Sequence, residues 1–173
     1  MRKPRPERLQ LPAKEPELRL APPVGPRALL APDESSGAPG VSASLPRVLI
    51  VEDDFLVSSD MEAELTDAGF AIVGIATSAQ EAIELAAAEA PHLVIMDIRL
   101  DGTRDGVDAA LEIFRSRGIR SLFASAYYDA ETRRRAEPSS PLGWIAKPYP
   151  MRTLVAAVRD AMRTVGGPEP QPE

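Results

Sequence analysis

From Arg47 to Val165, apolar residues occur in two alternating patterns. Short continuous apolar runs, typical of strands that are covered on both faces, alternate with longer segments whose apolar residues recur at helical spacing. The short runs predict strands at residues 47–51, 71–76, 92–97, 119–125 and 143–147. The longer segments predict helices at residues 55–69, 78–90, 106–118, 129–137 and 150–165. Five strands that alternate with five helices predict an α/β fold with a doubly wound parallel sheet.

Local signals mark the ends of several of these helices. Gly69 and Gly118 follow helical segments and can end them, and Ser78 with Glu81 forms a capping-box pattern. Prolines follow the fourth helical segment, so we expect that helix to be short. The positions expected to face the core recur at the helical period. They are Leu56, Ser59, Asp60, Ala63 and Leu65 in the first helix, Val107, Ala110, Leu111 and Phe114 in the third, and Leu154, Val155, Val158 and Met162 in the last.

Residues 1–46 differ in composition from the rest of the chain. They contain ten of the 18 prolines and only scattered leucines, so they cannot bury enough apolar area to offset their ordering entropy. They hold seven basic and five acidic residues, whereas residues 47–173 hold 13 and 21. We therefore expect a disordered segment at 1–46, one domain at 47–165 and a disordered tail at 166–173. The first segment is either an arm that binds or tethers a partner or a solvated extension.

Composition excludes several classes of function. The net charge of −6 argues against binding to nucleic acid, which requires a basic surface. The chain has no cysteine, so disulfides, thiolate catalysis and cysteine zinc sites are excluded. No apolar run approaches the length of a membrane helix, and the N-terminus lacks the apolar core of a signal peptide. We expect a cytoplasmic protein that does not bind a membrane.

Polar side chains that can take part in chemistry lie where the predicted strands end. Glu52 and Asp53 follow the first strand, Asp97 ends the third, Ser125 ends the fourth and Lys147 ends the fifth. In doubly wound sheets, ligands bind beyond the carboxyl ends of the strands, where the strand order reverses. We therefore expect these side chains to gather at one edge of the sheet.

Gathered carboxylates repel one another unless a cation offsets their charge. Magnesium suits such a site because it prefers oxygen ligands and binds through one or two carboxylates together with phosphate oxygens. Lys147 supplies a fixed positive charge for an incoming anion, and Ser125 supplies a hydroxyl donor. Asp97 is then placed as a nucleophile toward phosphorus, which predicts an aspartyl phosphate.

Four motifs in this order resemble the receiver domain of two-component response regulators. They are the acid pair in "LIVEDD", the acceptor in "VIMDIRL", the small hydroxyl residue followed by alanine in "FASA", and the lysine and proline in "AKPY". The resemblance covers about Arg47 to Val165 and implies a flavodoxin-like fold. The stretch "LFASAYYD" also resembles the Phe-Ala-Thr-Gly-x-Tyr variant of a subgroup of single-domain receivers, with serine in place of threonine and alanine in place of glycine.

The resemblance implies a metal set around the acceptor. Asp97 would accept the phosphoryl group and bind Mg²⁺. Asp53 would be a direct ligand, and Glu52 would act directly or through water. The backbone carbonyl of Arg99 would complete the protein ligands, whereas Asp54 lies just past the acid pair and is left out.

The resemblance also implies residues that respond to phosphate. Ser125 would hydrogen-bond a phosphoryl oxygen and move with it, and Lys147 would pair with the phosphate. The bond between Lys147 and Pro148 is expected to be cis. Trp144 stands where receivers often carry the aromatic residue that changes rotamer as the hydroxyl residue moves, although it could equally be a packing residue.

These implications predict a response regulator of the phosphorelay type that is not an enzyme in its own right. A histidine kinase or histidine phosphotransfer protein would donate the phosphoryl group. No output domain follows the last helix, so we expect a protein contact with an unknown downstream partner, or onward phosphotransfer.

Three other functions are alternatives for this sequence. A pseudo-receiver that is never phosphorylated would act as a binding module. A phosphatase of the haloacid dehalogenase type would need an aspartate at position 99, where the chain has Arg99. A dinucleotide-binding module would need a glycine-rich turn after the first strand, where the chain has "VEDDFL".

Overall fold

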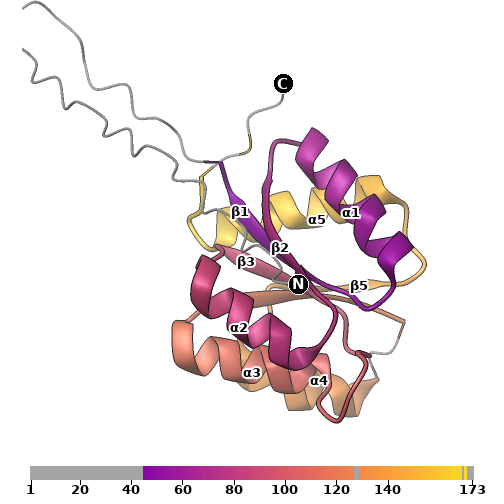
Figure 1. Ribbon diagram of the computed structural model, residues 1–173, viewed down its shortest axis with the longest axis vertical. Helices are drawn as coiled ribbons and strands as arrows, with labels where there is room; N and C mark the ends of the chain where they lie inside the picture. Colours follow the sequence, from indigo (N-terminus) through magenta and orange to yellow (C-terminus); the bar gives the residue numbers. More distant parts are fainter. Residues whose placement is uncertain (1–44, 127–128, 169, 171–173) are drawn as a thin grey trace, which may run out of the picture. The chain divides into compact units, whose positions relative to one another are not determined.

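Five parallel strands form the centre of the domain in a computed structural model (Figure 1). The structure describes residues 45–126, 129–168 and 170. The strands are β1 Arg47–Val51, β2 Ala71–Ala76, β3 Leu93–Met96, β4 Arg120–Ser125 and β5 Gly143–Ala146. The helices are α1 Phe55–Asp67, α2 Ala79–Glu89, α3 Gly106–Arg117, α4 Ala130–Ala136 and α5 Met151–Thr164, with a 3₁₀ turn η1 at Glu137–Ser139. The disorder expected at residues 1–46 and 166–173 concerns residues that lie largely outside those described, and it stays a prediction.

The strand order is β2-β1-β3-β4-β5, with every neighbouring pair parallel. This order, with its five helices, is the flavodoxin-like doubly wound fold that the alternating pattern and the resemblance predicted. The order reverses between β1 and β3, because β1 leads to β2 on one side and the chain then crosses to β3 on the other. The carboxyl ends of β1 and β3 therefore flank the expected ligand position.

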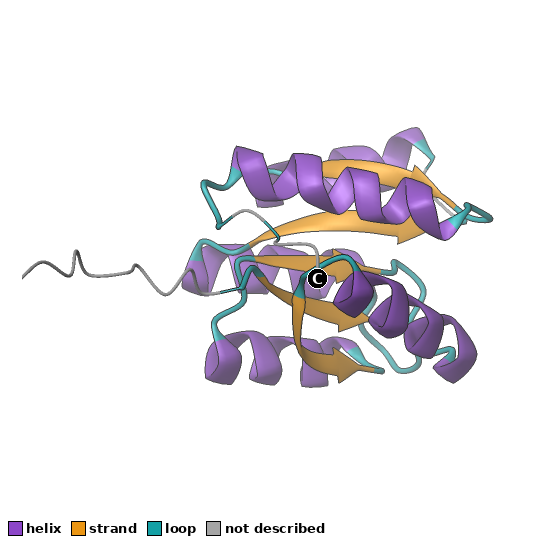
Figure 2. Cartoon of the chain, turned by 90° about the horizontal axis from the view of Figure 1, so that it is seen from above, coloured by secondary structure: helices purple, strands orange, loops and turns teal. Residues whose placement is uncertain are grey.

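Helices cover both faces of the sheet (Figures 1 and 2). Helices α1 and α5 lie on one face, and α2, α3 and α4 lie on the other. Each face has its own apolar cluster, and the residues of the central strands β1 and β3 divide between the two. The continuous apolar runs arise because side chains of a strand point alternately to two buried faces.

The predicted helix ends are confirmed with one change in detail. Gly69 and Gly118 adopt positive φ values of 87° and 70° at the ends of α1 and α3. Ser78 caps α2 by accepting a hydrogen bond from the Glu81 backbone N–H at 3.3 Å. The Glu81 carboxylate accepts from the backbone N–H of Thr77 rather than of Ser78, so the reciprocal half of the box is one residue earlier than predicted.

The core-facing side of α1 was predicted correctly at Leu65 and wrongly at Leu56, which is 73% exposed. The other buried residues of the helix are Ser58 and Met61. The helix begins directly at the sheet edge, where the Asp54 carboxylate caps it by accepting from the Leu56 and Val57 N–H groups. That start leaves the first turn beyond the edge of the sheet. Smaller shifts occur in α3, where Ile113 rather than Phe114 is fully buried, and in α5, where Ala161 rather than Val155 is.

The fourth helix is short, as predicted. Its seven residues pass directly into η1, where Pro138 cannot donate an α-helical hydrogen bond. The guanidinium of Arg120 then donates to the backbone carbonyls of Ser140 and Pro141. None of the helices in the described part of the chain is long and apolar enough to cross a membrane.

Candidate functional site

The carboxyl ends of the strands bring the predicted side chains to one edge. Val51 and Met96 are paired in register at the ends of β1 and β3, so Glu52 and Asp97 follow at the same level. The Asp97 N–H donates to the Val51 carbonyl at 2.9 Å, which extends the ladder by one bond. Ladder bonds of this kind place Asp97 without help from its side chain.

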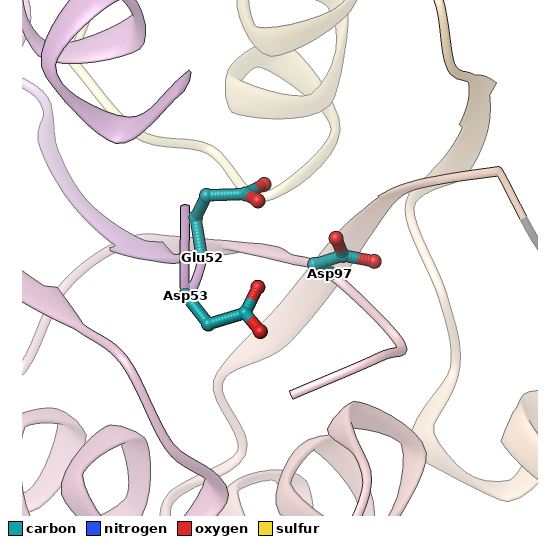
Figure 3. Close-up of side chains that lie close together, drawn as sticks. All are labelled: Glu52, Asp53 and Asp97. Atoms are coloured by element: carbon teal, nitrogen blue, oxygen red, sulfur yellow. The ribbon is translucent and has the colours of Figure 1, made fainter. Parts of the chain in front are cut away.

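Glu52, Asp53 and Asp97 form a cluster of three acids (Figure 3). One carboxylate oxygen of each lies within 4.8 Å of the others. Glu52 and Asp97 are buried, with 3% and 7% of their surface exposed, and Asp53 is exposed. Oxygen ligands at this spacing, two of them shielded from water and one open, suit a hard divalent cation.

Lys147 is the cation that the site itself provides. Its Nζ atom donates to Glu52 Oε2 at 2.5 Å and to Asp97 Oδ2 at 2.6 Å. The peptide bond that follows it, to Pro148, is cis, as the resemblance implied. Lys147 therefore joins the buried acids of β1 and β3 from the end of β5.

Burial and charge act against each other on this pair. Burial raises the pKa of Glu52 above its usual 4.5, because the hydrogen bond from Lys147 offsets the loss of water only in part. Burial also opposes the charge on Lys147, but the hydrogen bonds with Asp97 and Glu52 outweigh it and raise the pKa of the ammonium group. The site thus holds a lysine whose charged form is favoured beside a glutamate whose charged form is disfavoured by burial.

We expect Glu52→Gln to stabilise the fold in metal-free buffer at pH 7. A raised folded-state pKa means that the stability linked to Glu52 is present below about pH 4.5 and is lost as the pH rises through the folded-state value. Removal of the buried charge should therefore raise Tm at pH 7. Thermal unfolding followed at pH 7 and pH 4 measures this, and the gain should vanish at pH 4.

Asp53→Asn is the matched control, because that carboxylate is exposed. It should change Tm at pH 7 by less than Glu52→Gln does. A glutamine variant less stable than the wild type at pH 7 would show that the pair with Lys147 is worth more than the burial of Glu52 costs.

The loop after Asp97 is held close to it. The backbone N–H of Arg99 donates to Asp97 Oδ1 at 3.3 Å. Gly106, the first residue of α3, donates its N–H to the Ile98 carbonyl at 2.8 Å. The Asp97 carbonyl oxygen lies where a Cβ atom on Gly106 would be, 1.9 Å from that position. Only glycine allows α3 to start this close to the acidic cluster.

Ser125 and Trp144 lie in two different surroundings. Ser125 is 2% exposed at the end of β4, and its carbonyl accepts from the Lys147 N–H at 3.2 Å, which ties it to the site. The Trp144 ring stacks on Phe123, with centroids 4.4 Å apart, and the guanidinium of Arg133 lies 5.4 Å from the Trp144 ring centroid. Trp144 belongs to the apolar cluster beneath α3 and α4 and is outside the acidic cluster.

Two groups of residues near the edge escaped the sequence patterns. Arg135, to which no sequence pattern assigned a role, pairs with Asp105, the N-cap of α3, and with Asp108 in the first turn of that helix. A hollow of about 330 Å³ lies next to Lys147 and is lined by apolar residues of α1 and the start of α5. Its lining residues are Val57, Ala126, Lys147, Pro148, Tyr149 and Met151.

Comparison with known proteins agrees with this architecture. Residues 48–159 match the family described as the response regulator receiver domain. The chain belongs to this family. The family match does not resolve the subgroup suggested by "LFASAYYD", whose two tyrosines lie outside the described residues.

Two sequence relatives differ in how much of their length is matched. The chain is 37% identical over 121 residues to the transcriptional regulatory protein PdtaR of Mycobacterium tuberculosis, which covers 69% of the chain and 58% of PdtaR. It is 27% identical to the chemotaxis protein CheY of Halobacterium salinarum, over 67% of the chain and 96% of that protein. The chain therefore spans less than two thirds of PdtaR but nearly all of CheY.

Two solved structures share the fold. The signal receiver domain of a modulated diguanylate cyclase from Desulfovibrio desulfuricans G20 has a TM-score of 0.65 and 31% identity, over 71% of this chain and 98% of that one. The CheX-CheY-BeF3-Mg²⁺ complex from Borrelia burgdorferi has a TM-score of 0.61 and 21% identity, over 68% of this chain and 87% of that one.

Proposed function

We propose that this chain is a phosphorelay response regulator in which Asp97 accepts a phosphoryl group. The observation that carries the proposal is the position of Lys147, whose Nζ atom lies 2.6 Å from Asp97 Oδ2 at the edge where Glu52 and Asp53 gather. A nucleophilic carboxylate, a fixed cation and an acid pair at one edge are the parts that phosphoryl transfer needs. A lone aspartate that merely capped a loop would need neither the cation nor the pair.

The residues present fit a magnesium ion. Glu52, Asp53 and Asp97 offer oxygen ligands, and the Arg99 carbonyl is proposed as a fourth. When bound, the ion would neutralise negative charge on the phosphoryl oxygens. The Borrelia CheY complex contains Mg²⁺ and BeF3, which supports this assignment by analogy of fold.

The chemical step belongs to this chain's own side chains. An Asp97 carboxylate oxygen attacks the phosphorus of a phosphohistidine on the donor protein. The new P–O bond forms as the P–N bond breaks, and the electron pair leaves with the imidazole nitrogen. Lys147 holds the charge of the transferred group, and the Ser125 hydroxyl donates to one of its oxygens. The chain thus catalyses its own phosphorylation and the slow hydrolysis of the aspartyl phosphate, without turnover of a separate substrate.

Exposed apolar side chains beside the site support a protein as the donor. Phe55 and Leu56, in the first turn of α1, are 78% and 73% exposed. Val57 of the same turn lines the apolar hollow next to Lys147. Large apolar side chains exposed beside a reactive site suit contact with another protein, here a histidine kinase or a histidine phosphotransfer protein.

We expect the double variant Phe55→Ser and Leu56→Ser to slow phosphotransfer from the cognate donor by about tenfold or more, since two apolar side chains that contact with the donor would bury are lost. Labelling by acetyl phosphate, which needs no such contact, should stay at the wild-type rate. Leu45→Ser is the matched control, because Leu45 is 46% exposed near the start of β1, at the other end of the sheet. Equal slowing with acetyl phosphate would place the effect inside the site instead.

The phosphorylated chain is proposed to act through a protein contact with an unknown downstream partner, or through onward phosphotransfer to it. Movement of Ser125 toward the phosphate and rotation of Trp144 would accompany it. A cytoplasmic location and the lack of nucleic-acid and membrane binding remain part of the proposal. The second candidate function is a pseudo-receiver, a binding module that carries no phosphate.

The test is incubation of the full chain with acetyl phosphate and Mg²⁺, followed by intact mass measurement and location of the modified residue. We expect one phosphoryl group, bound as a hydroxylamine-sensitive acyl phosphate at Asp97, and none when the metal is chelated. Absence of label under all conditions, including incubation with each of the host's histidine kinases, would favour the pseudo-receiver. Label at another residue would contradict the acceptor assignment.

A further inference from the structure

Arg135 of α4 reaches across to the first turn of α3. Its Nη1 atom donates to Asp105 Oδ2 at 2.8 Å, and its Nη2 atom donates to Asp105 Oδ1 at 3.2 Å. The same Nη2 atom lies 3.4 Å from Asp108 Oδ1. This is the paired geometry in which a guanidinium binds a carboxylate best, and it joins residues 30 positions apart.

The two acids that Arg135 binds also form the cap of α3. Asp105 accepts from the Asp108 N–H at 3.0 Å, and Asp108 accepts from the Asp105 N–H at 3.4 Å, which completes a capping box. The position of Asp105 is therefore set by the start of α3. Arg135 attaches α4 to that helix start rather than to a mobile surface side chain.

The start of α3 is in turn held against the acceptor. Gly106 bonds to the Ile98 carbonyl and lies against the Asp97 carbonyl oxygen. Between the loop 98–105 and α4 there is a hollow of about 380 Å³, lined by residues of both, with Arg135 among them. Arg135 and Asp105 both line that hollow, and their ion pair bridges it. The ion pair therefore connects α4, through the cap and Gly106, to Asp97.

Helix α4 has seven residues, too few to be stable alone. Besides Arg135, it is held by its N-cap Asp129, by the buried Ala136, and by the Arg133 guanidinium over the Trp144 ring. The ion pair is partly exposed, with 44% of the Arg135 side chain and 32% of the Asp105 side chain accessible. Such a pair is too weak to carry the fold, but it is strong enough to change the balance between two positions of a short helix a few fold.

We propose that Arg135 is a positioning residue that couples α4 to the loop after Asp97, so that cation binding at the acidic cluster and the position of α4 influence each other. The proposal rests on the function proposed above, because the Arg99 carbonyl in that loop is one of the ligands. Coupling between sites is reciprocal. Since we propose that the bound ion favours the α4 position held by Arg135, release of α4 should weaken binding of the ion.

The test is calorimetric titration of Mg²⁺ into the full-length chain. We expect Arg135→Ala to weaken binding at least threefold. Simple electrostatics predicts the opposite sign, since loss of a positive charge near an acidic cluster should strengthen cation binding. Arg134→Ala is the matched control. It removes the same charge from the next position, and its guanidinium makes no hydrogen bond or ion pair within the described residues. Unchanged or tighter binding in Arg135→Ala would overturn the proposal.

A double-mutant cycle separates positioning from charge. Asp105→Asn keeps a good N-cap for α3 but loses the carboxylate that Arg135 binds. If the pair acts as a unit, Asp105→Asn combined with Arg135→Ala should bind Mg²⁺ no more weakly than either single variant. Additive effects in the double variant would overturn the proposal.

Hydrogen exchange of the α4 amides gives a readout that needs no metal. Exchange there should accelerate at least threefold in Arg135→Ala, with Arg135→Lys between this variant and the wild type and α1 unchanged. Wild-type protection of α4 in Arg135→Ala would contradict the coupling. Failure of the proposed function would show differently, as absence of phosphate on Asp97 with the α4 effects intact.

Discussion

Replacement of Asp97 with alanine should reduce phosphate incorporation from acetyl phosphate and Mg²⁺ to background. The carboxylate oxygen is the proposed nucleophile, and alanine offers no atom that can form the P–O bond. The fold should survive, because Lys147 keeps its hydrogen bond to Glu52 Oε2 at 2.5 Å after Asp97 is lost. Intact mass measurement after incubation gives the labelling, and circular dichroism confirms the fold.

Asp101→Ala is the matched control for this experiment. Asp101 is an exposed aspartate in the loop that follows Asp97. The control should label at the wild-type rate. That result would show that loss of one negative charge near the site is not enough to prevent phosphate incorporation. If Asp97→Ala still takes up phosphate, the acceptor is another residue.

Replacement of Gly106 with alanine should cost about 3 kcal/mol or more of the free energy of unfolding, because the added methyl group has no room. Its Cβ would lie 1.9 Å from the Asp97 carbonyl oxygen and 2.9 Å from the Asp97 carbonyl carbon. Both are backbone atoms of the loop that carries the acceptor, so neither can move without shifting the site. Urea unfolding of both proteins measures the difference.

Gly118→Ala provides the contrast. Gly118 has a φ of 70° and open space around its Cβ position, so the substitution meets only backbone strain, roughly 1–2 kcal/mol. Gly106→Ala should be the more destabilised of the two and should also lose phosphate incorporation. Similar losses of unfolding free energy in both variants would mean that α3 can start farther from Asp97 than the structure indicates.

The elements of the sheet could be predicted because their signals are local. The runs "RVLIV" and "HLVIMD" are apolar on both faces, and strands β1 and β3 occupy them within a residue. Helix ends at Gly69 and Gly118 follow from one residue that can adopt positive φ. Which face of a helix is buried depends less on the local sequence. Leu56 fits the helical period but is exposed, because the sheet ends before it could cover that turn.

The acidic cluster was predictable for a different reason. Parallel strands place their carboxyl ends at one edge, so Glu52, Asp53 and Asp97 had to come near each other once the fold was known. Which oxygen each acid offers to Lys147 was not predictable, since that contact joins residues 95 and 50 positions apart. Such contacts depend on how far each strand extends relative to its neighbours.

The amino-acid sequence by itself determined the alternation of strands and helices, the strand-end position of Asp97 and the membership of the acidic cluster. These follow from short-range periodicity and from the parallel order of the sheet. Only the tertiary structure decided that Arg135 binds the α3 cap, that Trp144 stacks on Phe123, and that Gly106 lies against the Asp97 carbonyl. Each of those contacts depends on the packing of separate elements, whose angle and spacing no local pattern records.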